Sequence, residues 1–192
     1  MSQLGHNRGP SMTKGLGWKR YAWRRARSQL LPKMPIEVVR LRVKRAQELG
    51  MDYKAYAGIR ATTGRDVIAL LFSENALRLL KDGRLPTERA AHLEKVLGTD
   101  CLAMVHAPLR PEDVTERNAV ILRAAVAPTM HTSWRDTRER ILALKGRTPA
   151  DGVVVIGETW AEKDWCATAR LAGFLPAEQY FGAPQSRVLP QL

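Results

Sequence analysis

The sequence predicts a mainly α-helical protein with a five-helix module at its centre, a basic helical arm before it and a small C-terminal α(+β) unit. Three observations support this prediction. Apolar residues recur at helical spacing in short segments between residues 52 and 106, the positive charge is concentrated before residue 50, and GVVVIG is the one clear strand. With 45% hydrophobic and 6% aromatic residues, the composition of the 192-residue chain is that of a globular protein.

The N-terminal region is predicted to be a flexible leader followed by a basic arm. Residues 1–17 contain four glycines and no apolar period, which is typical of a flexible segment. Residues 18–50 favour two helices, about 18–31 and 36–49, separated by Pro32 and Pro35. Their cations are predicted to contact phosphate groups: Arg20, Arg24, Arg25, Arg27, Arg40 and Lys44. A solvated charged surface is the alternative interpretation of both helices.

The net charge of +12 indicates an anionic partner. Residues 1–50 contain 12 basic and 2 acidic residues and therefore carry a net charge of +10, whereas the net charge of residues 111–192 is zero. Such a segment is typical of proteins that bind the phosphate backbone of nucleic acid, where binding releases condensed counterions. An anionic membrane surface is the competing acceptor.

The central module, residues 51–107, is predicted to contain five helices. Asp52 can cap the first, which Gly64 ends, and the others cover about residues 65–72, 74–81, 86–97 and 100–106. Ser73 can cap the third helix, with Glu74 favourably placed in its first turn. Pro86 suits a helix start, and Gly98 suits a left-handed stop.

The order SEN, ALRLL, KDGRLP, ERAAHLEKVLGTD resembles the lambda-repressor-like (Cro/CI, XRE) helix-turn-helix family over residues 52–106. The resemblance implies that the second helix of the pair enters the major groove of DNA. It places Ser73, Glu74, Asn75 and Arg78 at the base contacts and Arg84 at a phosphate. Leu71 stands where the family usually has glycine, which leaves open one unbroken helix over residues 65–81.

The C-terminal unit, residues 111–192, is predicted to serve dimerisation or effector binding. Apolar spacing favours helices over about 114–127 and 134–144, and GVVVIGET at 152–159 reads as a strand buried on both faces. A lone strand needs a partner, which could be other strands of this chain, a second copy of the chain or packed helices. A further helix is predicted after this strand.

A catalytic interpretation would begin at Glu158, Glu162, Asp164 and Cys166, which follow the strand. None of the four histidines lies near Cys166 in sequence to act as its base, and no pair of His or Cys residues has metal-site spacing. Phosphate-cradling glycine motifs are also missing. We therefore predict no metal, no cofactor and no enzymatic activity.

The function predicted from the sequence is that of a cytoplasmic, nucleoid-associated transcriptional regulator. It would bind double-stranded DNA in a sequence-specific way and could form a homodimer through the C-terminal unit. An RNA-binding or ribosome-associated protein is the first alternative, and a nucleic-acid-processing enzyme with carboxylates at 158–164 is the second. The chain has no run of about 18 apolar residues and no apolar stretch at its start, which argues against membrane insertion and export.

Overall fold

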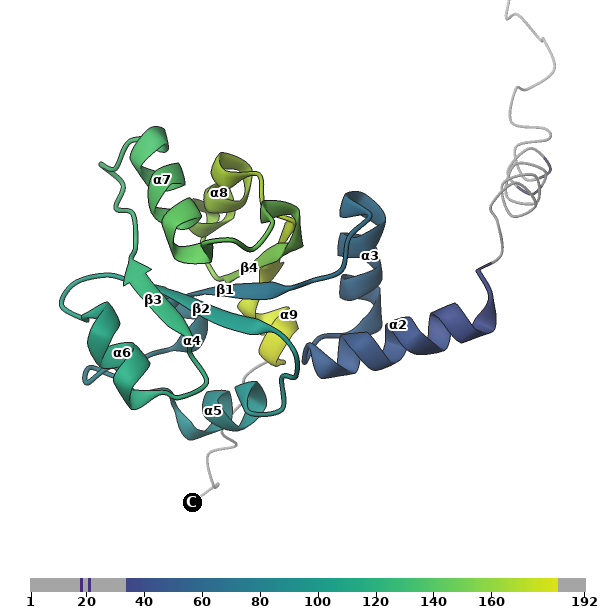
Figure 1. Ribbon diagram of the computed structural model, residues 1–192, viewed down its shortest axis with the longest axis horizontal. Helices are drawn as coiled ribbons and strands as arrows, with labels where there is room; N and C mark the ends of the chain where they lie inside the picture. The colour runs from purple at the N-terminus through teal and green to yellow at the C-terminus, as the bar shows by residue number, and fades with distance from the viewer. Residues whose placement is uncertain (1–17, 19–20, 22–33, 183–192) are drawn as a thin grey trace, which may run out of the picture. The chain divides into compact units, whose positions relative to one another are not determined.

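A computed structural model describes residues 18, 21 and 34–182. The chain divides into two compact units, residues 1–39 and 40–192. The second unit is built on five parallel strands (Figure 1) in the order β3-β2-β1-β4-β5. The strands are β1 (Ala69–Ser73), β2 (Asp100–Val105), β3 (Arg123–Val126), β4 (Val153–Gly157) and β5 (Gly173–Pro176).

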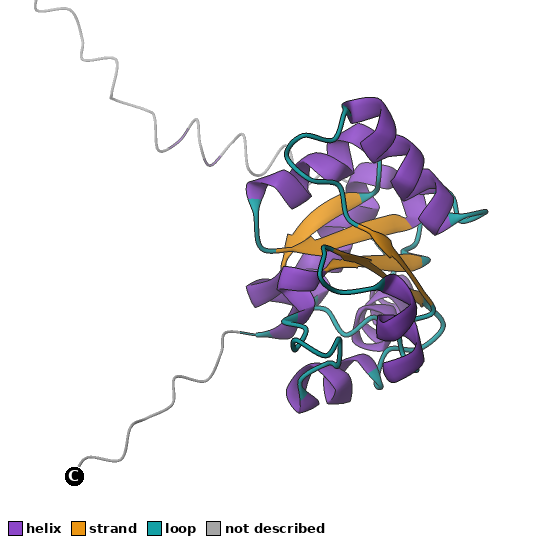
Figure 2. Cartoon of the chain, turned by 90° about the vertical axis from the view of Figure 1, so that its left-hand side faces the viewer, coloured by secondary structure: helices purple, strands orange, loops and turns teal. Residues whose placement is uncertain are grey.

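Helices cover both faces of the sheet, giving three layers (Figure 2). The first face carries residues of α2 (Ile36–Glu48), α3 (Tyr53–Thr63), α4 (Glu74–Leu77), α5 (Thr87–Leu93) and α9 (Ala177–Phe181). The second face is covered by α7 (Trp134–Lys145) and α8 (Trp160–Ala169), while α6 (Pro111–Arg117) connects β2 to β3. A single turn of 3₁₀-helix, Ala150–Gly152, precedes β4.

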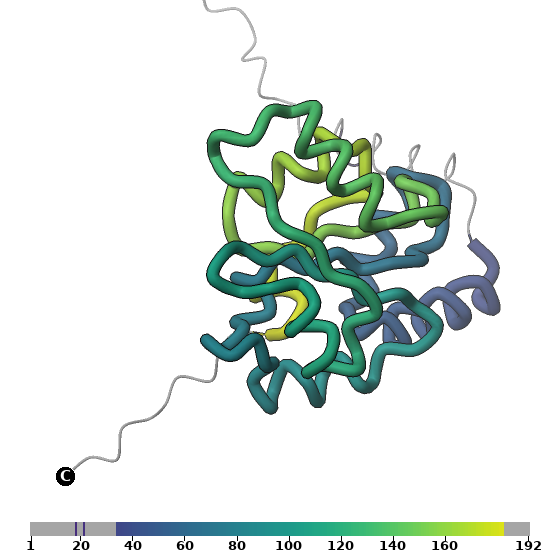
Figure 3. The backbone as a smooth tube through the Cα atoms, turned by 60° about the vertical axis from the view of Figure 1, so that its left-hand side comes forward, coloured from purple at the N-terminus to yellow at the C-terminus, as the bar shows by residue number. Residues whose placement is uncertain are grey.

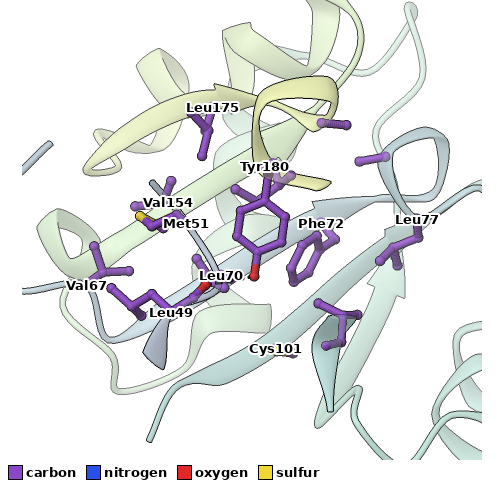
Figure 4. Packing of buried hydrophobic residues seen from close by; sticks show 14 of the residues in the cluster. Leu49, Met51, Val67, Leu70, Phe72, Leu77, Cys101, Val154, Leu175 and Tyr180 are labelled. Carbon is purple, nitrogen blue, oxygen red and sulfur yellow. Dashed lines mark hydrogen bonds between the residues drawn. The ribbon is translucent and has the colours of Figure 1, made fainter. Parts of the chain in front are cut away.

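Alternate residues of each strand enter the two cores. Leu70 and Phe72 of β1 lie in the first core, and Leu71 lies in the second, all at most 1% exposed. Figure 4 shows the first core, where Tyr180 of α9 packs on Phe72 and donates a hydrogen bond to the carbonyl of Leu49 at 2.9 Å. The last helix is thereby attached to the end of α2, 131 residues earlier.

The mainly α-helical prediction is wrong, because the structure is α/β with an all-parallel sheet. The segments predicted as helices over 65–72 and 100–106 contain β1 and β2, and the end of the predicted 114–127 helix is β3. The lambda-repressor-like module and its helix-turn-helix are therefore not present in the described residues. β1 pairs with β2 on one side and with β4 on the other, so strands far apart in the sequence run side by side (Figure 3).

Several local predictions are confirmed. Asp52 caps α3 by accepting hydrogen bonds from the amides of Lys54 and Ala55, and Gly64 ends that helix in the left-handed conformation, with φ of 72°. The helices predicted at 36–49 and 134–144 correspond to α2 and α7, and the predicted strand is β4. Partners for β4 come from this chain, so no second copy is needed to complete its pairing.

Candidate functional site

The order of the strands identifies the edge of the sheet where a ligand would bind. β1 continues to β2 on one side, whereas β4, on its other side, continues to β5 in the opposite direction. In open parallel sheets, ligands bind outside the carboxyl ends of the strands at such a switch point. Glu74 and Asn75 follow β1 here, and Glu158 and Thr159 follow β4.

A buried carboxylate connects the two sides of this switch point. Glu162, only 1% exposed, accepts hydrogen bonds through Oε2 from the amides of Glu158 at 2.6 Å and Thr159 at 2.9 Å. Its Oε1 accepts a hydrogen bond from Nδ2 of Asn75 at 2.7 Å. Thr159 caps α8 in return, completing a capping box. Because its oxygens are occupied by these donors, Glu162 fixes the site rather than serving as a free base.

A second contact orients the histidine that follows β2. Glu74 accepts a hydrogen bond from the backbone amide of His106, and the same oxygen lies 3.5 Å from His106 Nδ1. The other ring nitrogen, Nε2, lies 3.2 Å from the carbonyl oxygen of Pro128. Both ring nitrogens thus face acceptors, and a neutral imidazole can donate to only one of them. The imidazole ring is consequently held between Glu74 of α4 and the segment after β3.

A pocket of about 560 Å³ lies at this edge of the sheet. Asn75, His106 and Glu162 contribute polar groups, while Trp134 and Trp160 contribute indole rings. The two tryptophans are the first residues of α7 and α8, and they are 69% and 71% exposed. The rest of the lining includes hydroxyl, carboxylate and apolar groups, among them Thr129, Thr132, Asp164, Thr168, Met130 and Trp165. Such a pocket suits a flat ligand that has hydrogen-bonding edges.

The residues predicted as base contacts lie at this edge, though not on a groove-reading helix. Ser73 is fully buried and accepts a hydrogen bond from the amide of Ala76, so it caps α4 as predicted. Asn75 lines the pocket, whereas Arg78 lies 3.6 Å from Glu158 in an ion pair. Glu74 orients His106. The structure therefore brings Asn75 together with Glu162 after β4, and Glu74 together with His106 after β2.

The predicted phosphate contacts are dispersed. Arg84 pairs with Asp82 at 3.4 Å, Lys44 lies 3.9 Å from Glu48, and Arg40 is exposed on α2. Arg20, Arg24, Arg25 and Arg27 lie outside the described residues.

The four groups singled out for catalysis have different roles. Glu162 is the buried clamp, Glu158 pairs with Arg78, and Asp164 lines the pocket. Burial raises the pKa of the Cys166 thiol, so the nucleophilic thiolate is disfavoured. In the described part of the chain, no group of three His, Cys, Asp or Glu residues could hold a metal ion. No helix in this part is long and apolar enough to span a membrane.

Sequence reasoning missed the two tryptophans and His106. A local signal was present for the tryptophans. The segments SWRD (133–136) and TWAE (159–162) share one pattern, in which a capping residue is followed directly by a tryptophan and, three positions after the cap, by an acidic residue. Each motif begins a helix at the same edge of the sheet. His106 could be placed only once β2 was recognised as a strand.

No protein-family model, curated protein or solved structure matches the chain. The groups at the carboxyl edge of the sheet are consequently the basis on which a function can be proposed.

Proposed function

We propose that the protein binds nucleic acid through an unpaired nucleobase held in the pocket at the carboxyl edge of the sheet. The observation that carries this proposal is the pair of exposed indoles, Trp134 and Trp160, beside the polar groups of Asn75 and His106. Nucleobases are flat rings with hydrogen-bonding edges, and proteins bind them by stacking on aromatic side chains and bonding to those edges.

The charge of the chain supports a nucleic acid over an isolated base. The net charge is +12, of which +10 lies in residues 1–50, and such a segment attracts a phosphate backbone. Bases in a duplex are stacked on their neighbours, whereas unpaired bases can enter a pocket. Single-stranded or locally opened nucleic acid is therefore the proposed partner in place of an intact duplex, and a cytoplasmic, nucleoid-associated location follows from that partner.

Binding of fluorescently labelled single-stranded and duplex oligonucleotides of equal length tests the proposal. The wild-type chain should bind the single strand more tightly, and Trp134→Leu or Trp160→Leu should each weaken that binding about tenfold, since stacking contributes about 1–3 kcal/mol per base. Trp134→Phe and Trp160→Phe should retain most of the affinity, because they keep an aromatic face.

Leu97→Ala provides the matched control, since Leu97 is 60% exposed and does not line the pocket. This variant should bind both oligonucleotides as the wild type does. Equal affinity for single strand and duplex, unchanged in the tryptophan variants, would refute the proposal.

An enzyme that processes nucleic acid is a second candidate, favoured by His106 and Asp164 in the same pocket. Glu74 orients the imidazole, which is a common acid or base in catalysis. This candidate predicts chemical conversion of the bound oligonucleotide, detectable as a change in its mass, and loss of the conversion in His106→Gln. An oligonucleotide that is bound but recovered unchanged supports binding alone.

A further inference from the structure

The pocket at the carboxyl edge of the sheet is lined by acidic groups and by no lysine or arginine of the described residues. Its two carboxylates belong to Glu162 and Asp164. Charge in the whole chain has the opposite balance, with 31 basic and 19 acidic residues. Arg135 and Lys163, which adjoin pocket residues in the sequence, do not line it, and Arg135 pairs with Glu139 at 3.0 Å. A ligand that enters this pocket therefore meets negative charge.

Asp164 is the carboxylate that remains available to a ligand. Glu162 is buried and accepts three hydrogen bonds from protein donors, whereas Asp164 is exposed and forms no hydrogen bond or ion pair within the described residues. Asn75 adds a second acceptor. Its Nδ2 must face Glu162, because a carboxylate only accepts hydrogen bonds, and Oδ1 is then left without a donor in the described part of the chain. Both groups offer acceptors to a ligand.

Two indole rings complete this environment. Trp160 and Asp164 stand four positions apart on α8, so their side chains lie on the same face of the helix, and Trp134 lines the pocket from the start of α7. Neither indole forms a ring contact or a cation–π contact with a described residue. The face of an indole attracts cations more strongly than the face of any other aromatic side chain. The indoles and Asp164 therefore favour the same kind of ligand, one that is flat and positively charged.

We propose that the pocket selects a nucleobase that carries a positive charge, of the kind produced by methylation of a ring nitrogen, as in N7-methylguanine. This inference rests on the proposed function and names the class of base that is bound. A charged base should bind the indoles more tightly than a neutral one, because electrostatic attraction adds to stacking. The Watson–Crick edge of N7-methylguanine also presents N–H donors, which match the acceptors of Asp164 and Asn75.

Single-stranded RNA oligonucleotides of one sequence test the inference, with guanosine, N7-methylguanosine or 7-methyl-7-deazaguanosine at one central position. The third base has the shape of the second but no charge. The wild type should bind the N7-methylguanosine strand about tenfold more tightly than either of the others. Trp134→Leu and Trp160→Leu should each reduce this preference, because they remove a face that attracts the cation.

Asp164→Asn keeps the shape of the side chain, removes its charge and should reduce the preference to about threefold or less. Glu116→Gln is the matched control, since Glu116 is an exposed carboxylate on α6 that does not line the pocket, and it should keep the full preference. Equal affinity of the wild type for the charged and the uncharged methylated strands would overturn the inference. Failure of the proposed function would look different, because the tryptophan variants would then bind every strand as the wild type does.

Competition with tetramethylammonium, at constant ionic strength, distinguishes a charged base from an ammonium group. Free N7-methylguanosine should displace the methylated strand at least about tenfold more effectively than tetramethylammonium, because only the nucleoside has a flat ring that stacks on the indoles. Equally effective displacement by tetramethylammonium would assign the pocket to an ammonium group and would also overturn the inference.

Discussion

Glu162 is the side chain that connects the two sides of the switch point at the candidate site. It joins the loop after β4 to Asn75 after β1, and it does so from a fully enclosed position. A carboxylate suits this position because all three neighbouring groups are donors. An amide of the same shape has a single acceptor oxygen and would direct its own N–H groups at one of those donors.

Glu162→Gln is therefore expected to lower the free energy of unfolding by about 1–3 kcal/mol, the range for leaving a buried polar group unsatisfied. Urea denaturation followed by circular dichroism measures the change. The control is Glu116→Gln on α6, where the carboxylate is exposed, and it should stay within about 0.5 kcal/mol of the wild type. Equal stability of the two variants would show that the clamp is not a stabilising contact.

Cys101 predicts how stability depends on alkaline pH. Burial raises the pKa of its thiol from 9.0 to about 11, so the folded chain keeps the proton at pH values where the unfolded chain loses it. The contribution to stability is complete below pH 9 and is lost as the pH rises to about 11. Under reducing conditions, Cys101→Ala should show a shallower decline of stability over this interval than the wild type. Parallel declines would contradict the raised pKa.

At the scale of elements, the sequence identified helices with clear caps and one of the five strands; it assigned β1, β2 and β3 to helices and did not predict β5. β1 and β2 are continuous apolar runs, VIALLF and CLAMV, and such runs show neither helical nor alternating periodicity because both faces of the strand are buried. Only VVVI carried enough β-branched residues to indicate a strand by itself. The length of the runs is a further criterion, because apolar runs of about four to eight residues are typical of buried strands and helices are longer. Applied to all three runs, this criterion favours a parallel sheet.

Some residues of the candidate site were among those singled out from the sequence, and others were not. Glu74 and Asn75 were predicted as base contacts at the turn of a helix-turn-helix; that motif is not present in the described residues, although both side chains lie at the candidate site. Their partners could not be predicted, since His106, Trp134 and Trp160 meet them only through the pairing of strands that were not recognised.

Leu71→Gly separates the two folds directly. A helix-turn-helix of the family proposed from the sequence would accept glycine at this position, whereas the sheet buries Leu71 in its second core. We expect the free energy of unfolding to fall by about 4 kcal/mol, because the apolar side chain is removed and the backbone gains freedom. Leu97→Gly, at a 60% exposed position, should cost about 1 kcal/mol or less. A tolerated Leu71→Gly would argue against the sheet.

At the scale of the whole molecule, the proposed function assigns affinity and selectivity to different parts of the chain. The neutral C-terminal part contributes both tryptophans of the pocket, while +10 of the net charge of +12 lies in residues 1–50. Cations that meet phosphates should give affinity that depends on salt, whereas stacking in the pocket should depend on it much less.

Replacement of Arg24 and Arg25 by alanine tests this separation. The slope of the logarithm of the binding constant against the logarithm of salt concentration should decrease in magnitude by about 1.4 for a single strand, or about 0.7 for each phosphate that is no longer neutralised. The preference for single strand over duplex should remain. Arg110→Ala with Arg170→Ala removes the same charge elsewhere and should leave the slope close to that of the wild type. An unchanged slope in the Arg24/Arg25 variant would place the phosphate-binding cations elsewhere in the chain.

The central position of β1 in the sheet has a consequence for folding of the chain during its synthesis on the ribosome. β1 ends at residue 73, but one of its two neighbours in the sheet, β4, begins only at residue 153. Domains fold as units during synthesis, so β1 must wait with one edge open until about 80 further residues have emerged. During that interval, a strand with four apolar residues out of five presents unpaired backbone groups to other chains. Nascent chains arrested between β3 and β4 should accordingly be the species that depend most on chaperones.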